Sequence, residues 1–406
     1  MRFTADRDFI ERWVAFRRDL HRHPELSFQE KRTAEQIEKA LARLGIKSRR
    51  VAGTGVLAEI PSAAGGTEGP MVALRADTDA LPIREETGLE YASIHDGVMH
   101  ACGHDGHTAM VLGAAEMLAK GGNLSVPVRL VFQPAEERGL GALSMIDAGA
   151  LDGVEMIFGG HVDRHYATGQ IVAHAGAVNA STDSFRIEIQ GKGGHAARPH
   201  EGVDAVVVGS LLVMSIQTIV SREINPAHPS VVTVGRFDAG TAPNVLAGRA
   251  TLEGTIRTQE KAVRDHIVSS LSRICDSIGA LHNARLTLTL EEGTPPVVNP
   301  KDMAEIAREA AVAVVGEANA VPLHTANMGG EDFACYMEKI PGCYVRLGAR
   351  APGREGFPAH SSRFEFDEEV IPIGARYFYE VARLAGGILS PGQSGRSPSA
   401  TSISST

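Results

Sequence analysis

The stretch MVALRAD, residues 71–77, decides the fold class because its apolar residues are almost continuous. A strand buried on both faces has this pattern, whereas a strand with one wet face alternates apolar and polar residues. VPVRLVFQPAEE (126–137) repeats the pattern and ends in acidic residues, and VEMIFGGH (154–161) ends in a histidine. HTAMVLGAAEMLAK (107–120), between the first two, is helical. This order, with reactive groups at strand ends, predicts an α/β domain with a doubly wound, mostly parallel sheet.

The pattern changes near residue 180. SFRIEIQGKGG (184–194), ATLEGTIRT (250–258) and RLTLTLE (285–291) alternate apolar and polar residues, as antiparallel strands with one wet face do. Two helical segments, 204–220 and 259–281, lie between them. The order β-α-β-β-α-β predicts a two-layer, ferredoxin-like unit.

The doubly wound pattern returns after this unit and continues into a last helix at 368–386. We therefore predict a discontinuous catalytic domain, residues 1–179 and 293–390, interrupted by an inserted lid or dimerisation domain, residues 180–292. The Ser/Gly/Pro-rich residues 391–406 predict a disordered tail.

Composition excludes several classes of protein. With 406 residues, 43% hydrophobic and 22% charged, the chain resembles an ordinary globular protein. A net charge of −9 argues against nucleic-acid and anionic-membrane surfaces. The longest apolar run, residues 205–214, is shorter than the about 20 residues of a membrane span. No signal-peptide pattern is visible, and four cysteines without paired spacing fit a reducing compartment, so we expect a cytoplasmic location.

The stretch MHACGHDGHTAM (99–110) crowds potential metal ligands. Cys102 and His104 are spaced as a loop would present them, and together they suit one zinc, manganese or cobalt centre or two neighbouring ones. Isolated histidines are usually surface or core residues, and adjacent glutamates are usually solvated. Two carboxylates that follow a buried strand are costly without a cation, however. Further candidate ligands therefore stand at the strand ends and in a late loop: Glu136, Glu137, His161 and His360.

Five stretches in order resemble one family of enzymes. They are ALRADTDALPI (73–83), MHACGHDGHTAM (99–110), FQPAEERGLGA (132–142), GKGGHAARPH (191–200) and GGEDFACY (329–336). Together they are similar to the amidohydrolases that include hippurate hydrolase, indole-acetyl-amino-acid hydrolase and N-acyl-amino-acid aminoacylases, a branch of the carboxypeptidase G-like dimetal hydrolases. The resemblance runs from about residue 20 to about residue 375.

The resemblance implies a set of metal ligands. It matches Cys102, His104, Glu137, His161 and His360 to the ligands of two divalent ions, manganese, zinc or cobalt. Five ligands are few for two ions, so we expect Cys102 to bridge them as a thiolate. We expect Asp79 to hydrogen-bond a ligand histidine, although it could be an ordinary acid at a strand end. Asp105 and His107 are further candidates for the surroundings of the site.

The resemblance also implies a mechanism and a substrate. Glu136 is the general base for attack of a metal-activated water on the amide of an N-acyl-amino acid. His195 is the donor to the oxyanion, reaching the site from the inserted domain of the same chain or of a partner in a homodimer. We expect Asn244 and Arg257 to contact the substrate carboxylate or the oxyanion, although Arg257 could be an exposed strand arginine.

Alternatives stay open at this point. A dipeptidase or an N-acetyl-diaminopimelate-type deacetylase would use the same scaffold. A non-catalytic metal-dependent binding protein would not need Glu136. A thiol-redox protein would need a second cysteine near Cys102, and the sequence has none close by. Relatives usually carry an aromatic–proline pair after the third ligand, whereas this chain has HVDRHYATG (161–169), which puts the substrate in doubt.

Overall fold

The computed structural model describes residues 6–121, 124–353 and 356–390, and it divides the chain into two compact units. Unit 1 contains the described residues up to Gly176, Asn299–His324 and those from Asp332 onward. Unit 2 contains Ala177–Val298 and Thr325–Glu331. The predicted disordered tail, residues 391–406, lies outside the described residues.

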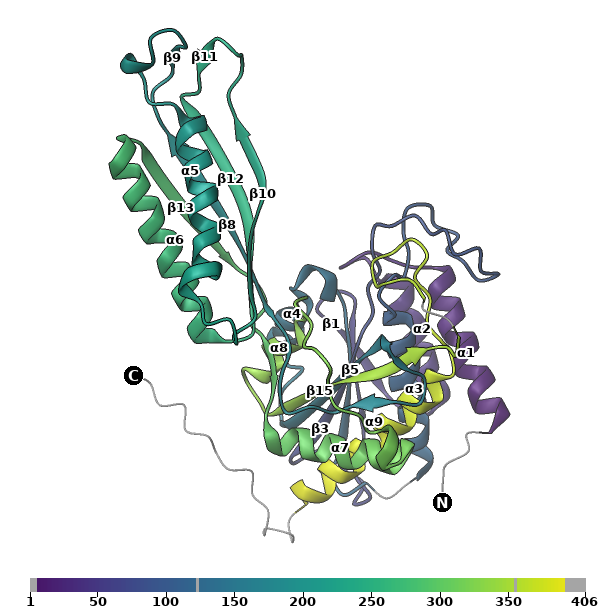
Figure 1. The fold of residues 1–406 in the computed structure, drawn as a ribbon. Coiled ribbons are helices and arrows are strands. Elements are labelled where there is room, and N and C mark those ends of the chain that lie inside the picture. Colours follow the sequence, from purple (N-terminus) through teal and green to yellow (C-terminus); the bar gives the residue numbers. More distant parts are fainter. Residues whose placement is uncertain (1–5, 122–123, 354–355, 391–406) are drawn as a thin grey trace. The chain divides into compact units, whose positions relative to one another are not determined.

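Unit 1 is built on a seven-stranded sheet with the order β1-β2-β4-β3-β5-β15-β6 (Figure 1). The pairs β3/β4, β3/β5 and β5/β15 are parallel, and the outer pairs β1/β2, β2/β4 and β15/β6 are antiparallel. The predicted α/β class is therefore confirmed, with a parallel-rich sheet whose four central strands, β4, β3, β5 and β15, are parallel. The strands are β1 (Ser48–Val51), β2 (Gly55–Ile60), β3 (Met71–Asp77), β4 (Val128–Gln133), β5 (Val154–Ala167), β6 (Ile171–Val172) and β15 (Gly342–Arg350).

Helices cover both faces of this sheet. On one face, Val72, Leu74 and Ala76 of β3 join the hydrophobic core that includes α3 and α9. On the other face, Arg75 donates to Asp332, which directly precedes α8. All seven residues of β3 are buried as a result. The helices are α1 (Arg7–Arg22), α2 (Lys31–Arg43), α3 (His104–Gly121), α4 (Gly141–Asp147), α7 (Lys301–Val315), α8 (Phe333–Met337), α9 (Val370–Leu389) and the short 3-10 turns η1 (Glu136–Arg138) and η4 (Glu317–Asn319).

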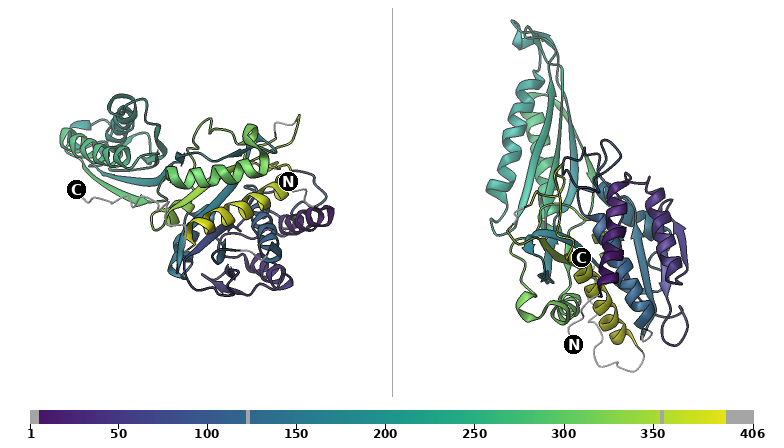
Figure 2. Two further views of the ribbon diagram at one scale, coloured as in Figure 1. Left: turned by 90° about the horizontal axis from the view of Figure 1, so that it is seen from below. Right: turned by 90° about the vertical axis from the view of Figure 1, so that its right-hand side faces the viewer.

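Unit 2 is a four-stranded antiparallel sheet with the order β10-β12-β8-β13. Helices α5 and α6 lie side by side on one face of it (Figures 1 and 2). The chain order β8, α5, β10, β12, α6, β13 is the predicted β-α-β-β-α-β order. The elements are β8 (Ser181–Gln190), β9 (Gly194–His195), η2 (Pro199–Glu201), α5 (Ala205–Thr218), η3 (Ile219–Glu223), β10 (Ser230–Ala239), β11 (Val245–Leu246), β12 (Arg249–Thr258), α6 (Lys261–His282) and β13 (Arg285–Glu292), with β7 (Gly176–Asn179) pairing β14 (Val297–Asn299).

The alternation predicted for the antiparallel strands is present in β8. Phe185, Ile187 and Ile189 are buried in the core of unit 2, whereas Arg186 and Glu188 are exposed. The apolar run at 205–214 forms the first part of a longer helical segment, Ala205–Glu223. Within the described part of the chain, this one segment is long and apolar enough to cross a membrane by length and composition alone.

Close packing between α3 and α9 fixes α3 relative to the sheet. Gly113 in the middle of α3 faces Ala375 of α9, and a Cβ at residue 113 would lie 2.8 Å from the Cβ of Ala375. A Cβ at Gly387, near the end of α9, would meet nothing within 4 Å. The two glycines therefore form a matched pair.

We expect Gly113→Ala to lower the free energy of unfolding by about 1–3 kcal/mol, because an added methyl group overpacks the helix contact. Gly387→Ala should leave the free energy of unfolding unchanged or raise it by up to about 1 kcal/mol, because alanine favours the helix. Urea unfolding followed by circular dichroism measures both. Equal effects would show that the two helices separate easily.

Candidate metal centre

Five side chains from distant segments converge beyond the carboxyl end of β4, at the middle of β5 and at the start of α3. The ligand atoms of Cys102, His104 and His161 all lie within 4.8 Å of one another. Those of Cys102, Glu137 and His360 form a second group with the same property. The structure thus brings together all five residues that the sequence proposed as ligands, and Cys102 belongs to both groups.

The contacts inside the two groups join atoms that carry lone pairs. The Sγ of Cys102 lies 3.2 Å from the Nε2 of His161. The Nε2 of His360 lies 3.4 Å from the Oε1 of Glu137, and the Nε2 of His104 lies 3.9 Å from the same oxygen. A divalent cation between these atoms would displace the protons that they now share and would be coordinated by their lone pairs.

Two of the histidines are oriented by hydrogen bonds from their other ring nitrogen. The Nδ1 of His104 donates to the backbone oxygen of Asp79 at 2.9 Å. The Nδ1 of His161 donates to the backbone oxygen of Val162 at 2.7 Å. Each ring therefore keeps the lone pair on Nε2, and that atom faces the other ligands, as in known metal sites.

The donors fit a divalent cation. The Nε2 of His104 is buried and has no hydrogen-bond partner among the described residues, which is costly unless something binds it. Burial and the nearby carboxylate of Glu137 raise the pKa of the Cys102 thiol to about 12. The thiol therefore keeps its proton at neutral pH until a cation displaces it. Imidazole, carboxylate and thiolate together suit zinc, cobalt or manganese.

Asp79 holds the two glutamates in place. Its two carboxylate oxygens accept from the backbone N–H of Glu136 and of Glu137, each at 3.1 Å. Ala135, just before them, has φ 54°, a left-handed conformation that costs energy for a residue with a Cβ. Burial opposes ionisation of Asp79, but its hydrogen bond with His104 lowers its pKa. One ionised carboxylate thus orients a histidine and an acidic turn.

The sequence analysis assigned no role to Asp77, which also lies at this site. Its Oδ1 accepts from the Nδ1 of His107 at 2.6 Å, and its Oδ2 accepts from Arg75 at 2.6 Å. The Nε2 of His107 in turn accepts from the backbone N–H of Val162 at 3.0 Å. The sequence did contain one sign of this contact: His104 and His107, three residues apart, lie on one face of a helix, so a single carboxylate can lie near both.

Of the three candidate residues in unit 2, His195 and Asn244 lie next to each other, and Arg257 lies far from both. His195 pairs with Val245 across β9 and β11, and the backbone N–H of Ala196 donates to the backbone oxygen of Asn244 at 3.1 Å. His195 and Asn244 are therefore neighbours. Arg257 lies eight residues beyond Arg249 on β12, which places it about 26 Å further along the strand. Arg257 is half-buried, and burial lowers its pKa.

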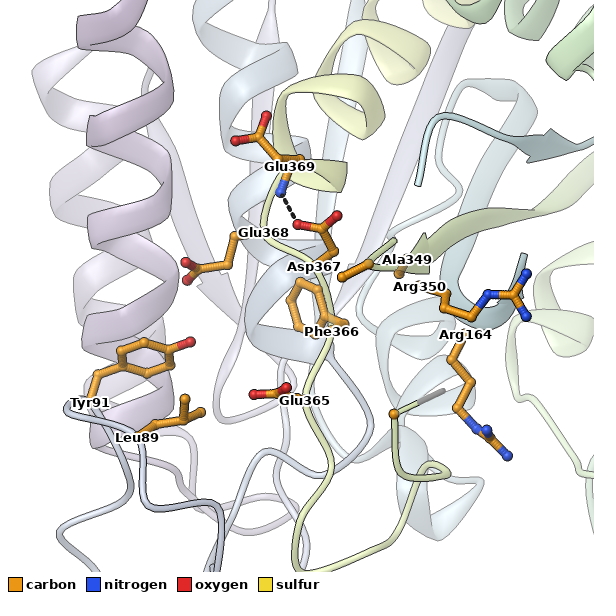
Figure 3. A pocket seen from close by; sticks show the side chains of 12 residues that line it. Leu89, Tyr91, Arg164, Ala349, Arg350, Glu365, Phe366, Asp367, Glu368 and Glu369 are labelled. Atoms are coloured by element: carbon orange, nitrogen blue, oxygen red, sulfur yellow. Dashed lines mark hydrogen bonds between the residues drawn. The ribbon is translucent and has the colours of Figure 1, made fainter. Parts of the chain in front are cut away.

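Unit 1 also contains a cavity of about 300 Å³ beyond the end of β15. Figure 3 shows Arg164 and Arg350 on one side of it and Tyr91, Leu89 and Glu368 on the other. Arg164 follows His161 by three residues on β5. The strand that carries this candidate ligand therefore also contributes to the wall of the cavity.

Comparison with known proteins identifies the family. Residues 73–384 match the profile of peptidase family M20/M25/M40. The chain is 41% identical over 373 residues to the N-acetyl-L-cysteine deacetylase of Bacillus subtilis, covering 91% of this chain and 87% of that protein. The chain belongs to peptidase family M20/M25/M40. The family resemblance drawn from the five sequence stretches is thereby confirmed.

Other members of the M20/M25/M40 family match over similar lengths. An IAA-amino acid hydrolase of Arabidopsis thaliana is 37% identical over 375 residues, covering 91% of this chain and 84% of that protein. The structure of the Bacillus subtilis YXEP protein, described as a dinuclear metal-binding peptidase of the M20 family, superimposes with a TM-score of 0.82. It is 37% identical and covers 94% of this chain and 99% of that one.

We expect Asp79→Ala to weaken binding of a divalent cation about 10–100-fold, because the variant releases both the acidic turn and the ring of His104. Isothermal titration of the metal-stripped protein with Zn²⁺ measures the change. Asp96→Ala is the matched control, since Asp96 is exposed and its described ion pair is with the exposed Arg84. An unchanged affinity for Zn²⁺ in Asp79→Ala would show that the turn containing Glu136 and Glu137 keeps its conformation without the Asp79 carboxylate.

Proposed function

We propose that this chain hydrolyses the amide bond of N-acyl-amino acids with the help of two divalent metal ions. The observation that carries the proposal is the position of Cys102 in both groups of ligand atoms, with Glu136 beside a member of each. The named activities of the relatives, an N-acetyl-L-cysteine deacetylase and an IAA-amino acid hydrolase, support the same bond and the same substrate class.

Cys102 would bridge the two ions in this proposal. His104 and His161 would complete one ion's protein ligands, and Glu137 and His360 those of the other. When bound, such a pair of ions lowers the pKa of a water and polarises the substrate carbonyl. Manganese, zinc and cobalt all accept this donor set.

Glu136 would move the proton. Its Oε2 lies 3.9 Å from the Nε2 of His104, and it does not belong to either group that contains Cys102. Glu137 would therefore hold a metal, and Glu136 would take a proton from the attacking water. Glu136 would then deliver that proton to the nitrogen of the leaving amino acid.

His195 would donate to the oxyanion of the tetrahedral intermediate. Its Nδ1 accepts from the backbone N–H of Ala197 at 3.1 Å, which leaves the proton on the exposed Nε2. Asn244, its neighbour, would contact the same part of the substrate. Arg257 would bind the substrate carboxylate, and its place at the other end of β12 means that it would act apart from the other two.

A substrate panel tests the proposal. The metal-stripped protein should turn over no N-acyl-amino acid, and adding Mn²⁺, Zn²⁺ or Co²⁺ should restore activity. Dipeptides and N-acetyl-diaminopimelate belong in the panel, because these alternative substrates would need the same site. Release of the free amino acid is the measured quantity.

Glu136→Ala should retain its metal and lose about 10²–10⁴-fold in kcat, because no other group takes the proton of the attacking water. His195→Ala should lose about 10²–10³-fold in kcat with its metal content unchanged. Metal analysis and steady-state kinetics measure both. Glu90→Ala, at an exposed position, is the control. Near wild-type activity in Glu136→Ala would refute the assignment of the base.

We also propose a homodimer formed through unit 2. Helix α5 exposes four large apolar side chains, and β10 is an edge strand of the unit 2 sheet. A contiguous apolar surface next to an unpaired strand edge fits a second copy of this chain. The exposed apolar residues are Val206, Val207, Leu211 and Met214 on α5 and Val231 and Phe237 on β10.

The oligomeric state in solution tests this interface. Met214→Asp should convert a dimer to a monomer, because the Met214 side chain is exposed and a buried carboxylate there would lack a partner. Ser272→Asp, on the exposed side of α6, should leave the dimer intact. Light scattering coupled to size-exclusion chromatography gives the mass. A monomeric wild-type protein would exclude the interface.

We further propose a cytoplasmic location. The thiols of Cys275 and Cys343 are buried and unpaired, which fits a reducing compartment.

A further inference from the structure

A buried charged cluster joins helix α1 to the first turn of α3. Arg17 and His21, one helical turn apart on α1, are both fully buried. Asp105, the second residue of α3, is fully buried as well. The Nε of Arg17 lies 2.7 Å from the Oδ2 of Asp105, and the Nδ1 of His21 donates to the same oxygen at 2.8 Å.

Two further carboxylates complete the cluster. The Nε2 of His21 donates to the Oε1 of Glu85 at 3.2 Å, and the Nη1 of Arg17 donates to Glu368 at 3.2 Å. The guanidinium of Arg17 also lies 5.1 Å from the ring centroid of Tyr91. Figure 3 shows Glu368 extending toward the purple helix α1, on the side of Tyr91. The cluster therefore holds four separate segments of unit 1 together.

Burying these charges costs desolvation free energy, so we expect the cluster to fix the positions of its members more than to stabilise the fold. Burial and the nearby Arg17 oppose protonation of His21, but hydrogen bonds to Asp105 and Glu85 outweigh them and raise its pKa. Both ring nitrogens face carboxylates, an arrangement that favours the protonated ring. Buried ion pairs are often no more stabilising than apolar side chains of similar volume. What such a network does supply is a fixed arrangement of its members.

The arrangement that it fixes carries two of the candidate ligands. Asp105 directly follows His104, and its Oδ1 accepts from the backbone N–H of Gly106 at 3.0 Å. Cys102 is joined to His104 through Gly103, which has φ 90° and packs so closely that a Cβ would lie 2.4 Å from Val162. A short chain thus links both ligands to Asp105.

We propose that His21, through its hydrogen bond to Asp105, positions Cys102 and His104 for metal binding. This inference rests on the proposed function. His21 is a positioning residue, because its hydrogen bonds are with the buried cluster and not with the ligands themselves. A purely structural role would change the free energy of unfolding but not the metal affinity of the folded protein.

Two isosteric variants separate the two hydrogen bonds of His21. The amide nitrogen of asparagine replaces Nδ1, and that of glutamine replaces Nε2. His21→Asn therefore keeps the donor to Asp105, whereas His21→Gln keeps only the donor to Glu85. Both variants remove the same positive charge, so a difference between them reports the contact with Asp105.

Titration of the metal-stripped protein with Co²⁺ alone reads out the site. We expect His21→Gln to bind Co²⁺ about 10–100-fold more weakly and to show an altered thiolate-to-cobalt charge-transfer band from Cys102. His21→Asn should bind within about threefold of the wild type. Glu85→Gln, which leaves the contact with Asp105 in place, is a further control. Thermal unfolding of each variant sets a titration temperature at which all are folded.

Wild-type affinity and an unchanged band in His21→Gln would overturn the inference. If that variant does not fold, Asp105→Asn replaces it, and the same weakening is expected. An amide nitrogen in the place of Oδ2 cannot accept from His21, while the amide oxygen still accepts from the backbone N–H of Gly106. Cys102→Ser should abolish the band. An intact band in Cys102→Ser would instead refute the proposed metal centre, so the two failures are distinguishable.

Discussion

The carboxylate of Asp79 is the constraint on which the candidate site depends. It follows β3, a strand buried along its whole length, so it has little freedom to move. From that fixed place it accepts from the backbones of Glu136 and Glu137 and lies 3.2 Å from the Nδ1 of His104. Three segments are thereby held with their lone pairs facing one another. Buried ligand atoms whose lone pairs face one another are stabilised when a cation binds between them.

The sequence predicts the fold well where burial is uniform or strictly alternating. The run at 71–77 coincides with β3, and the alternation at 184–194 marks β8. The strand β10 gave no such signal, because it is an edge strand, mostly exposed, with a register shift between Val234 and Arg236. Helices α4 and α8, of 7 and 5 residues, are too short for a helical period to show.

The candidate ligands were predictable because metal-binding residue types stand in recognisable motifs. The residues that orient these ligands were not predictable, because their roles depend on contacts between distant segments. Arg17 looks like a charge on the polar side of an amphipathic helix, yet it is fully buried against Asp105. Asp77 looks like the end of a strand, yet it accepts from His107, 30 residues away. Only the packed fold reveals such partners.

The segment after His161 connects a candidate ligand to the wall of a cavity in unit 1. A hydrogen bond to the backbone oxygen of Val162 orients the His161 ring. Beyond it β5 continues to Ala167, and Asp163 accepts from the ring of His165 at 2.7 Å. Arg164, between them, points to the opposite face and lines the cavity in Figure 3. The segment therefore presents a hydrogen-bonded Asp163–His165 pair on one face of β5 and the cation of Arg164 on the other.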